Sequence, residues 1–283
     1  MLDAAARATD AAVLDQSEGL RHWLPQAPSH GTRVIAMVSR GESRTEQPLL
    51  WQICTSLEGL GHSVAVLDGT TAESEHNPGL QQLLDHAHWL DHPHEDANWQ
   101  IVPSRLGLAR LASRDMEDDM GLPPLGNLGN LGPLFKDFNI VLLYARADAL
   151  MSLLSGTGVR PLLAIAPSRN SIVGGYQTLK QLLQRAQRLP ILVSLVTGPL
   201  KAAENRATVA ARSLRQCAAT YLGCDTEVLS IRSFPQQDLP CEDTPRLVLR
   251  LLESAATVGG GWPSSFAPAG FGSGAVVHPV RSQ

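Results

Sequence analysis

The chain has 283 residues, of which 43% are hydrophobic and 18% are charged, and its formal net charge is −4. This composition is typical of a globular protein with one large α/β domain, and it excludes a general nucleic-acid binder because no lysine or arginine run offsets the negative charge. No apolar run approaches the ~20 residues of a membrane span. The four cysteines have no C-x-x-C spacing and no signal peptide precedes them, so we expect reduced cytosolic thiols at Cys54, Cys217, Cys224 and Cys241.

The composition along the chain predicts three regions. Residues 1–32 are a leader, in which an alanine-rich, potentially helical stretch is followed from Pro25 by a linker rich in Pro, Ser and Gly. Residues 33–258 alternate apolar and polar segments as a single α/β domain does. Residues 259–283 are rich in Gly, Ser and Pro, and we expect this tail to be disordered.

The domain opens with a β–loop–α–β unit. Arg33–Ser39 is an apolar, partly β-branched run typical of a buried parallel strand. A polar loop is expected at residues 40–47, followed by a helix with Pro48 in its first turn and Gly61 at its end. A second apolar strand then ends on Asp68.

The rest of the domain repeats the alternation of strands and helices. Further strands are expected to begin at Trp99 and to cover Phe138–Ala145, Val159–Pro167, Pro190–Gly198 and, as the last strand, Thr226–Ser233. Helices are expected at Leu80–Leu90, Arg146–Gly158, Ser168–Leu189, Lys201–Gly223 and, as the final helix, Thr244–Val258. Residues 113–135, which lie between the strand that begins at Trp99 and the strand at Phe138–Ala145, have four glycines and three prolines, and we expect a loop there. This order predicts a mostly parallel, doubly wound sheet with helices on both faces.

The order and spacing of these segments resemble those of the MinD/ParA group of deviant P-loop ATPases over about residues 33–235. Ser39 takes the first position of the group's phosphate-loop motif, the helix end at Leu60–Gly61 falls in register, and Asp68 matches the acid that ends the second strand. FNIVLLYA, at residues 138–145, corresponds to the Walker B strand, and IAPSRNSIVGGYQTLKQL is similar to a segment with the pattern P-x-x-x-S-I-x-x-x-Y. The resemblance implies the P-loop NTPase-like fold of the SIMIBI, MinD-type proteins.

In this register the phosphate loop has lost the residues that carry its chemistry. Bound phosphates need backbone N–H groups and ammonium charges around them. Gly41 stands at the signature lysine, Glu46 at the P-loop lysine and Gln47 at the magnesium-binding threonine. The positions of three glycines that let the backbone approach phosphate hold larger side chains, Glu42, Ser43 and Thr45. Carboxylates at these positions add repulsion where a phosphate requires attraction.

Two positions outside the loop depart from the pattern as well. Tyr144 falls at the Walker B aspartate, and Ser194 falls where the family commonly has an asparagine that contacts the purine. Asp68 alone among the compared site positions is retained. We therefore predict a degenerate nucleotide site at Gly41, Glu46, Gln47, Asp68, Tyr144 and Ser194, with no cofactor, no metal and no ATPase activity.

The leader carries a second resemblance. DQSEGLRHWL, which begins at Asp15, is similar to the D-Q-A-x-x-L-R segment at the N-terminus of FlhG (FleN), a MinD-like family that regulates flagellar number and placement. In that family the segment is a short helix that binds the signal-recognition-type GTPase FlhF and stimulates GTP hydrolysis. The resemblance implies a partner-binding segment in which serine replaces the alanine and the contacting residues are Asp15, Gln16, Leu20, Arg21 and Leu24.

Three functional hypotheses follow. The first is a non-catalytic, FlhG-like regulator of flagellar biogenesis that binds an FlhF-type GTPase, in the bacterial cytoplasm or at the cell pole or inner membrane through its partner. The second is a MinD/ParA-type ATPase that still binds Mg·ATP through a rearranged loop and acts in positioning or in another surface-assembly pathway such as cellulose export. The third is an interaction module whose leader is unrelated to FlhF. Self-association and peripheral membrane contact stay open in all three.

Other clusters have plainer interpretations. His86, His88, His92 and His94 have a spacing that can converge on zinc or nickel, but no cysteine or fixed fourth ligand accompanies them, so we interpret them as solvated residues. Ser171 and Tyr176 lack a nucleophile elbow and a paired His/Asp pattern, which favours a helix N-terminus packed on the sheet. The acidic residues 115–119 are expected to be solvated. The final helix has two arginines and no lysine, which favours packing on the sheet over membrane binding.

Overall fold

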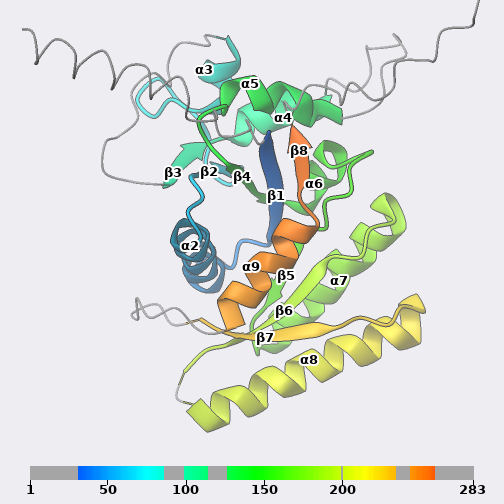
Figure 1. Ribbon diagram of the computed structural model, residues 1–283. Coiled ribbons are helices and arrows are strands. Elements are labelled where there is room, and N and C mark those ends of the chain that lie inside the picture. The colour runs from blue at the N-terminus through cyan, green and yellow to red at the C-terminus, as the bar shows by residue number, and fades with distance from the viewer. Residues whose placement is uncertain (1–30, 86–98, 114–125, 199, 234–242, 259–283) are drawn as a thin grey trace, which may run out of the picture.

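The computed structural model describes residues 31–85, 99–113, 126–198, 200–233 and 243–258. In this part of the chain an eight-stranded sheet has the order β3-β2-β4-β1-β5-β6-β7, with β8 paired to β1 outside that path (Figure 1). The strands are β1 (Thr32–Ser39), β2 (Val64–Asp68), β3 (Trp99–Pro103), β4 (Ile140–Arg146), β5 (Leu162–Ile165), β6 (Ile191–Val196), β7 (Val228–Arg232) and β8 (Ala256–Val258). All pairs are parallel except β1 with β8, which confirms the predicted fold class.

Helices cover both faces of the sheet. They are α2 (Ser43–Gly59), α3 (Leu80–Asp85), α4 (Arg105–Ser113), α5 (Leu131–Leu134), α6 (Ala147–Leu153), α7 (Arg169–Ala186), α8 (Leu200–Leu222) and α9 (Asp243–Glu253), with a 3₁₀ helix η2 at Gly126–Asn130. Ser168 begins α7 as an N-cap whose hydroxyl accepts a hydrogen bond from the Ser171 N–H, at 3.2 Å. The predicted strands and long helices are therefore present. Of the helix predicted at Leu80–Leu90, the structure describes Leu80–Asp85, and residues 86–90 lie outside the described ranges.

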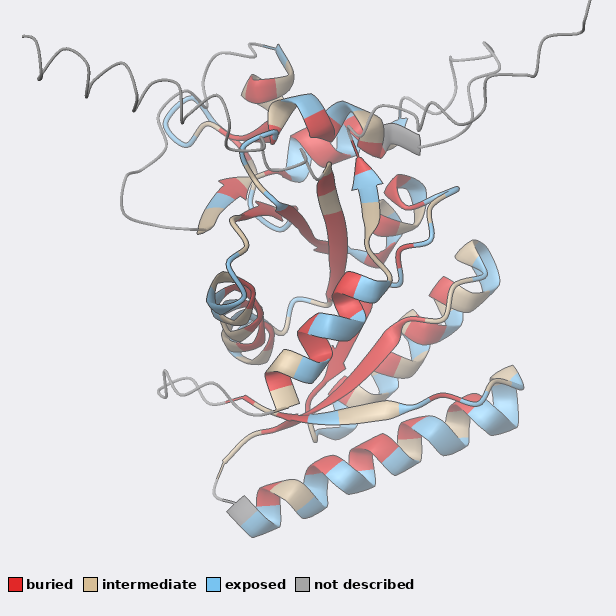
Figure 2. Ribbon diagram, in the orientation of Figure 1, coloured by how far each residue is buried: buried red, intermediate tan, exposed pale blue. Residues whose placement is uncertain are grey.

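The core forms two layers because successive strand residues point to opposite faces. On β1, Val34, Ala36 and Val38 face the layer under α4, α6, α7 and α8, whereas Ile35 and Met37 face the layer under α2 and α9. Figure 2 shows the central strands buried along almost their whole length. Because helices cover both faces of this sheet, its backbone N–H and C=O groups reach solvent mainly at the ends of the strands, and a binding site can form there.

The first helix begins earlier than predicted. The sequence indicated a loop over residues 40–47 and Pro48 in the first turn, but α2 begins at Ser43 and Pro48 lies inside it. The loop between β1 and α2 is therefore only three residues long. The helix extends because the amides of Thr45 and Glu46 bond to the carbonyl of Glu42, at 2.9 and 3.0 Å.

Two other predictions were wrong. Thr226–Ser233 is not the last strand, because the segment predicted as the end of the final helix leaves that helix and forms β8. One edge of β1 is paired with β4 along residues 33–39. The strand β8 therefore pairs with Thr32–Val34 on the other edge of β1. The expected loop 113–135 contains η2 and α5 in its last part, where Leu128, Leu131 and Phe135 are fully buried. Their burial stabilises short helical turns in spite of the glycines.

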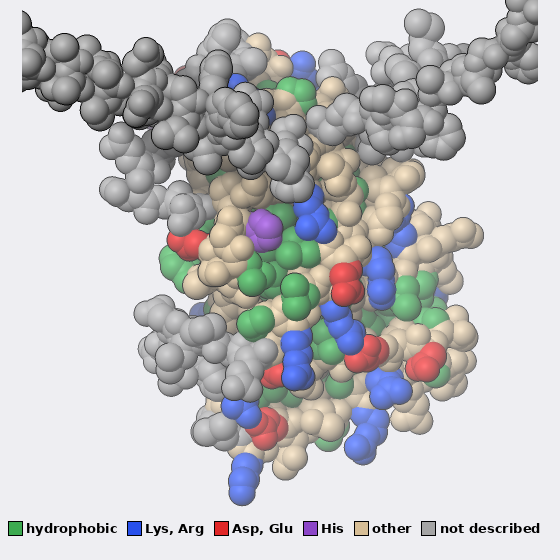
Figure 3. Space-filling view, viewed as in Figure 1, with side chains coloured by type: hydrophobic (Ala, Val, Ile, Leu, Met, Phe, Trp, Pro, Cys, Tyr) green, Lys and Arg blue, Asp and Glu red, His purple; other side chains and the backbone are tan. Residues whose placement is uncertain are grey.

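The final helix is strongly amphipathic and lies on the sheet. Its residues Leu247, Val248 and Leu251 are buried beside α2, whereas Leu249 is exposed. On the face seen in Figure 3, basic and acidic side chains are interspersed rather than gathered by sign. None of the helices in the described ranges is both long and apolar enough to span a bilayer.

Burial also controls the chemistry of one thiol. Cys54 on α2 has no exposed surface, and burial raises its pKa to about 12, so the reactive thiolate is scarce at pH 8. We predict that Cys54 resists iodoacetamide at pH 8 in the native protein and reacts readily in urea. Peptide-resolved mass spectrometry of alkylated protein measures both rates. Equal rates of Cys54 alkylation with and without urea would contradict the burial of the Cys54 side chain.

Candidate functional site

The site lies where β1, β2 and β4 end. In the strand order, β1 stands between β4 and β5, with the strands that follow it divided between its two sides. The helix after β1 packs on one face of the sheet and the helix after β4 packs on the other. Their loops diverge, and a crevice outside the carboxyl ends of parallel strands at such a switch point is the usual place for a ligand in an open α/β sheet.

A buried carboxylate fills the α2 side of this crevice. Glu46, in the first turn of α2, is 1% exposed. One carboxylate oxygen, Oε1, accepts a hydrogen bond from the backbone N–H of Arg40 at 3.0 Å. The other, Oε2, accepts hydrogen bonds from the hydroxyls of Tyr144 at 2.8 Å and Ser39 at 3.3 Å. The carboxylate thus joins β1, α2 and β4, and it lies in the position where the phosphate-loop resemblance would require a lysine.

The Arg40 guanidinium supplies the compensating charge. Its side chain is 8% exposed, and its Nε lies 4.0 Å from Oε1 of Glu46. Nη1 and Nη2 donate to the backbone carbonyl and the hydroxyl of Ser171 on α7, both at 2.7 Å, and Nη2 also contacts a carboxylate oxygen of Glu42 at 3.0 Å. The Ser171 hydroxyl donates to the other oxygen of Glu42 at 2.8 Å and accepts from the N–H of Ala166. The guanidinium thus contacts two carboxylates and Ser171 and offsets part of their negative charge, while its Nε has no hydrogen-bond partner among the described residues.

Part of the backbone around this loop is committed to the protein itself. Phosphate binding at a helix N-terminus depends on free N–H groups that point at the anion. The amide of Arg40 bonds to Glu46, the amide of Gly41 bonds to the Ser39 hydroxyl, and the amides of Thr45 and Glu46 in α2 bond to the carbonyl of Glu42. With these donors occupied and two carboxylates beside them, the start of α2 disfavours an anion.

The tyrosine of the network remains protonated. Burial raises the pKa of Tyr144, and the negative charge of Glu46 raises it as well, although the hydrogen bond with Ser39 acts in the opposite direction. The phenol therefore donates to the Glu46 carboxylate at neutral pH and does not act as an anion.

The structure brings some of the predicted site residues together and not others. Glu46 and Tyr144 are in direct contact, and Asp68 is the register partner of Tyr144 on the neighbouring strand. The Asp68 carboxylate accepts hydrogen bonds from the hydroxyls of Thr70 and Thr71, at 2.6 and 2.7 Å. Among the remaining positions, the amide of Gly41 donates to the Ser39 hydroxyl at 3.4 Å, whereas Gln47 is exposed and the hydroxyl of Ser194 donates to the carbonyl of Ala207.

Gly41 lies in the short loop at φ +80, a conformation that favours glycine. The leader residues Asp15, Gln16, Leu20, Arg21 and Leu24 and the histidine cluster lie outside the described residues. Residues 259–283 and the acidic stretch 115–119 also lie outside the described residues. Of the predicted loop 113–135, the structure describes residue 113 and residues 126–135.

Two members of the network, Arg40 and Ser171, are not anticipated from the sequence. Arg40 is expected only as a loop residue and Ser171 only as part of a helix N-terminus, whereas Glu42 is already among the positions expected to repel phosphate. Arg40 and Ser171 are 131 positions apart in the chain. The available signal is two acids that alternate with two arginines directly after a buried strand, which favours an internal ion pair over a solvated loop.

The α7 side of the same crevice is open. It forms a groove of about 850 Å³, which we call the α7 groove. One wall is a polar face of α7 and the other is formed by the loops after β1, β2 and β4 and by the start of α4. Its charged lining residues are Arg40, Glu42, Arg105, Arg146, Asp148 and Arg185.

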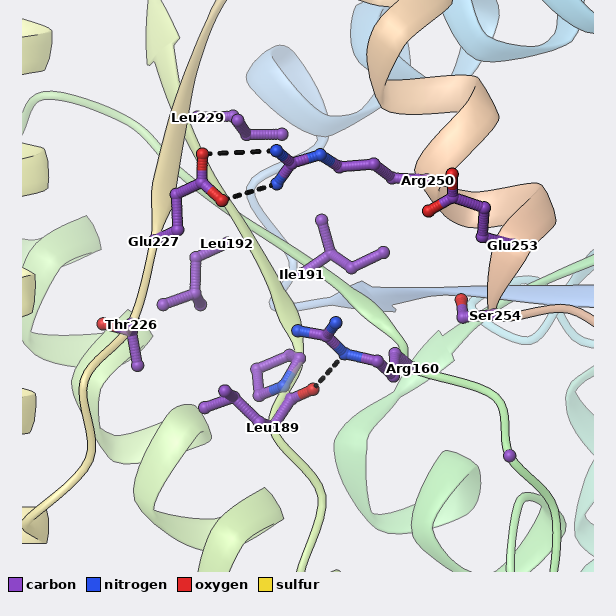
Figure 4. Close-up of a pocket in the computed structure, with 12 residues that line it drawn as sticks. Arg160, Leu189, Ile191, Leu192, Thr226, Glu227, Leu229, Arg250, Glu253 and Ser254 are labelled. Carbon is purple, nitrogen blue, oxygen red and sulfur yellow. Dashed lines mark hydrogen bonds and ion pairs between the residues drawn. The ribbon is translucent and has the colours of Figure 1, made fainter.

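A second cavity, of about 660 Å³, lies at the opposite edge of the sheet, before β5, β6 and β7 (Figure 4). Arg250 of α9 faces Glu227 and donates two hydrogen bonds to its carboxylate, at 2.8 and 3.3 Å, which lowers the pKa of Glu227. Arg160 extends its terminal nitrogens into the cavity while its Nε donates to the Leu189 carbonyl. With Glu253 the charges of this cavity balance, so it offers no net attraction for an ion.

No protein-family model and no curated protein matches the sequence. Among solved structures, the chain is similar to the MinD cell division protein of Aquifex aeolicus, with 13% identity, 80% of this chain and 100% of that chain covered, and a TM-score of 0.46. It is also similar to a ParA family ATPase of Chlorobium tepidum TLS (13% identity, 79% and 92% covered, TM-score 0.43) and to MinD of Pyrococcus furiosus (15%, 78% and 97%, TM-score 0.41). At these identities the likeness concerns the fold alone.

The buried carboxylate gives a stability prediction. Replacing Glu46 with alanine should lower the free energy of unfolding by about 3 kcal/mol, because the Arg40 amide and the Tyr144 hydroxyl lose their acceptor and the guanidinium loses a nearby charge. Urea unfolding followed by circular dichroism measures the change. The control Glu75→Ala, at an exposed position, should change stability by no more than about 0.5 kcal/mol. Equal effects of both substitutions would contradict the role of the network.

Proposed function

We propose that this protein is a non-hydrolysing regulator of flagellar biogenesis that acts by binding an FlhF-type GTPase through its leader. The observation that carries the first half of the proposal is the position of Glu46. Its carboxylate, held by Arg40 and Tyr144, occupies the side of the crevice in which a P-loop ATPase would hold phosphate. Nucleotide-driven control would then be absent, and partner concentration would control assembly by mass action.

The second half of the proposal rests on the leader sequence. Its D-Q-x-x-x-L-R pattern, ahead of a linker and an α/β domain, is similar to the GTPase-binding segment of FlhG. An amide side chain presented beside a bound nucleotide can orient the attacking water, and the binding energy of the rest of the segment can position it. In this proposal Gln16 is the residue nearest the chemistry, and Leu20 and Leu24 supply apolar contact. The protein would work in the cytoplasm and reach the cell pole or inner membrane through its partner.

The proposal predicts that Mg·ATP does not bind. Titration calorimetry of the full chain with Mg·ATP should show no saturable heat up to millimolar nucleotide, because binding requires the start of α2 to unwind and Glu46 to leave its buried partners. The variant Glu46→Gln, which removes one negative charge, should also fail to bind because the loop still has no lysine and still carries the Glu42 carboxylate. Binding at micromolar concentration would instead support the ATPase hypothesis.

The proposal also predicts stimulation of a cognate FlhF-type GTPase. The full chain should raise the rate of GTP hydrolysis, and Gln16→Ala should remove most of that increase while leaving association of the two proteins nearly unchanged. Phosphate release and a pull-down measure the two effects. Gln26→Ala, in the linker, is the matched control and should behave as the parent protein. An increase that Gln16→Ala leaves untouched would refute the role of the leader, and no increase would refute the partner.

A further inference from the structure

The α7 groove has an excess of positive charge in an acidic protein. Four arginines and two acidic residues line it, which leaves a net charge of +2, whereas the whole chain has a net charge of −4. Two of the arginines are paired with the two acids, Arg40 with Glu42 at 3.0 Å and Arg146 with Asp148 at 3.6 Å. The side chains of Arg105 and Arg185 are exposed and form no hydrogen bond or ion pair with any other residue that the structure describes. These two guanidinium groups are available to a ligand.

The groove is long compared with a single small anion. The lining residues of α7 run from Asn170 to Arg185, which corresponds to about 22 Å at 1.5 Å per residue. Arg40 is held at the start of this helix by Ser171, and Arg185 is close to its end. An extended peptide would need about seven residues to follow the same length, whereas one phosphate or carboxylate group contacts only one point along it.

The lining chemistry favours carboxylates along this length. Guanidinium groups form forked hydrogen bonds with carboxylates, and the polar side chains between them, Gln177 and Gln181, can bond to a peptide backbone. The loop after β1 contributes Arg40, Gly41 and Glu42 to the lining of this groove, whereas the Glu46 carboxylate is buried and is not among the lining residues.

We infer that the α7 groove binds an extended acidic segment of a partner protein, with Arg105 and Arg185 as its main charge contacts. This goes beyond the proposed function, because it concerns a second surface and does not depend on the leader. The two arginines come from different elements, α4 and α7, so a bound segment would bridge them.

The test is fluorescence anisotropy of a fluorescein-labelled octaglutamate peptide with the full chain. The peptide should bind with a dissociation constant on the order of 10 μM at low salt and more weakly at high salt, since exposed charges are screened. The double variant R105Q/R185Q should weaken binding at least about tenfold. The control R212Q/R246Q removes two exposed arginines outside the groove and should change binding by less than about twofold.

Several outcomes would overturn the inference. Absence of saturable binding, or equal loss in the two double variants, would show that the groove is no specific site. Competition by inorganic tripolyphosphate or by a short single-stranded DNA at concentrations well below that of the peptide would assign the groove to a phosphate ligand instead. Stimulation of the GTPase is measured through Gln16, so failure of one proposal is distinguishable from failure of the other.

Discussion

The Glu46 carboxylate is the constraint on which the arrangement of the C-terminal edge depends. It is buried between β1, α2 and β4, and a buried charge is tolerated only if donors and an opposite charge surround it. The Arg40 amide and Tyr144 hydroxyl supply the donors, and the Arg40 guanidinium supplies the charge while it also reaches α7 through Ser171. One carboxylate therefore links the loop after β1, the first turn of α2 and β4, and through Arg40 it is connected to α7.

This constraint divides the crevice at the switch point into two parts with different properties. On the α2 side, the buried Glu46 carboxylate accepts hydrogen bonds from Arg40, Tyr144 and Ser39 and fills the space that a ligand would need. On the α7 side, two exposed arginines remain without partners among the described residues, and the groove stays open. The cavity at the other edge of the sheet balances its charges within itself. In the proposed function the protein binds other proteins, which requires an open surface with free charged groups, such as the α7 groove. The leader would provide a further binding surface.

Most of the fold could be predicted from periodicity, because strands buried on both faces read as continuous apolar runs and the helices between them are long. The predictions failed where a tertiary contact overrode a local preference. Pro48 favours a first turn, but bonds from Thr45 and Glu46 to the Glu42 carbonyl start the helix earlier. The segment after α9 lacks strand length, yet β8 forms because an edge of β1 is free to pair with it. Glycine-rich residues 126–134 are helical because Leu128 and Leu131 are buried.

The sequence by itself determined the order of the long strands and helices along the chain, the absence of lysine from the loop after β1, and the presence of Glu46 and Tyr144 where the phosphate-loop resemblance would place a lysine and the Walker B aspartate. It could do so because these properties belong to single positions or to local spacing. Only the tertiary structure decided that the two residues touch, that the Arg40 guanidinium lies beside both Glu46 and Glu42, and that Arg105 and Arg185 line one groove. Those facts depend on which strand ends meet at one edge of the sheet, and chain order alone does not determine that.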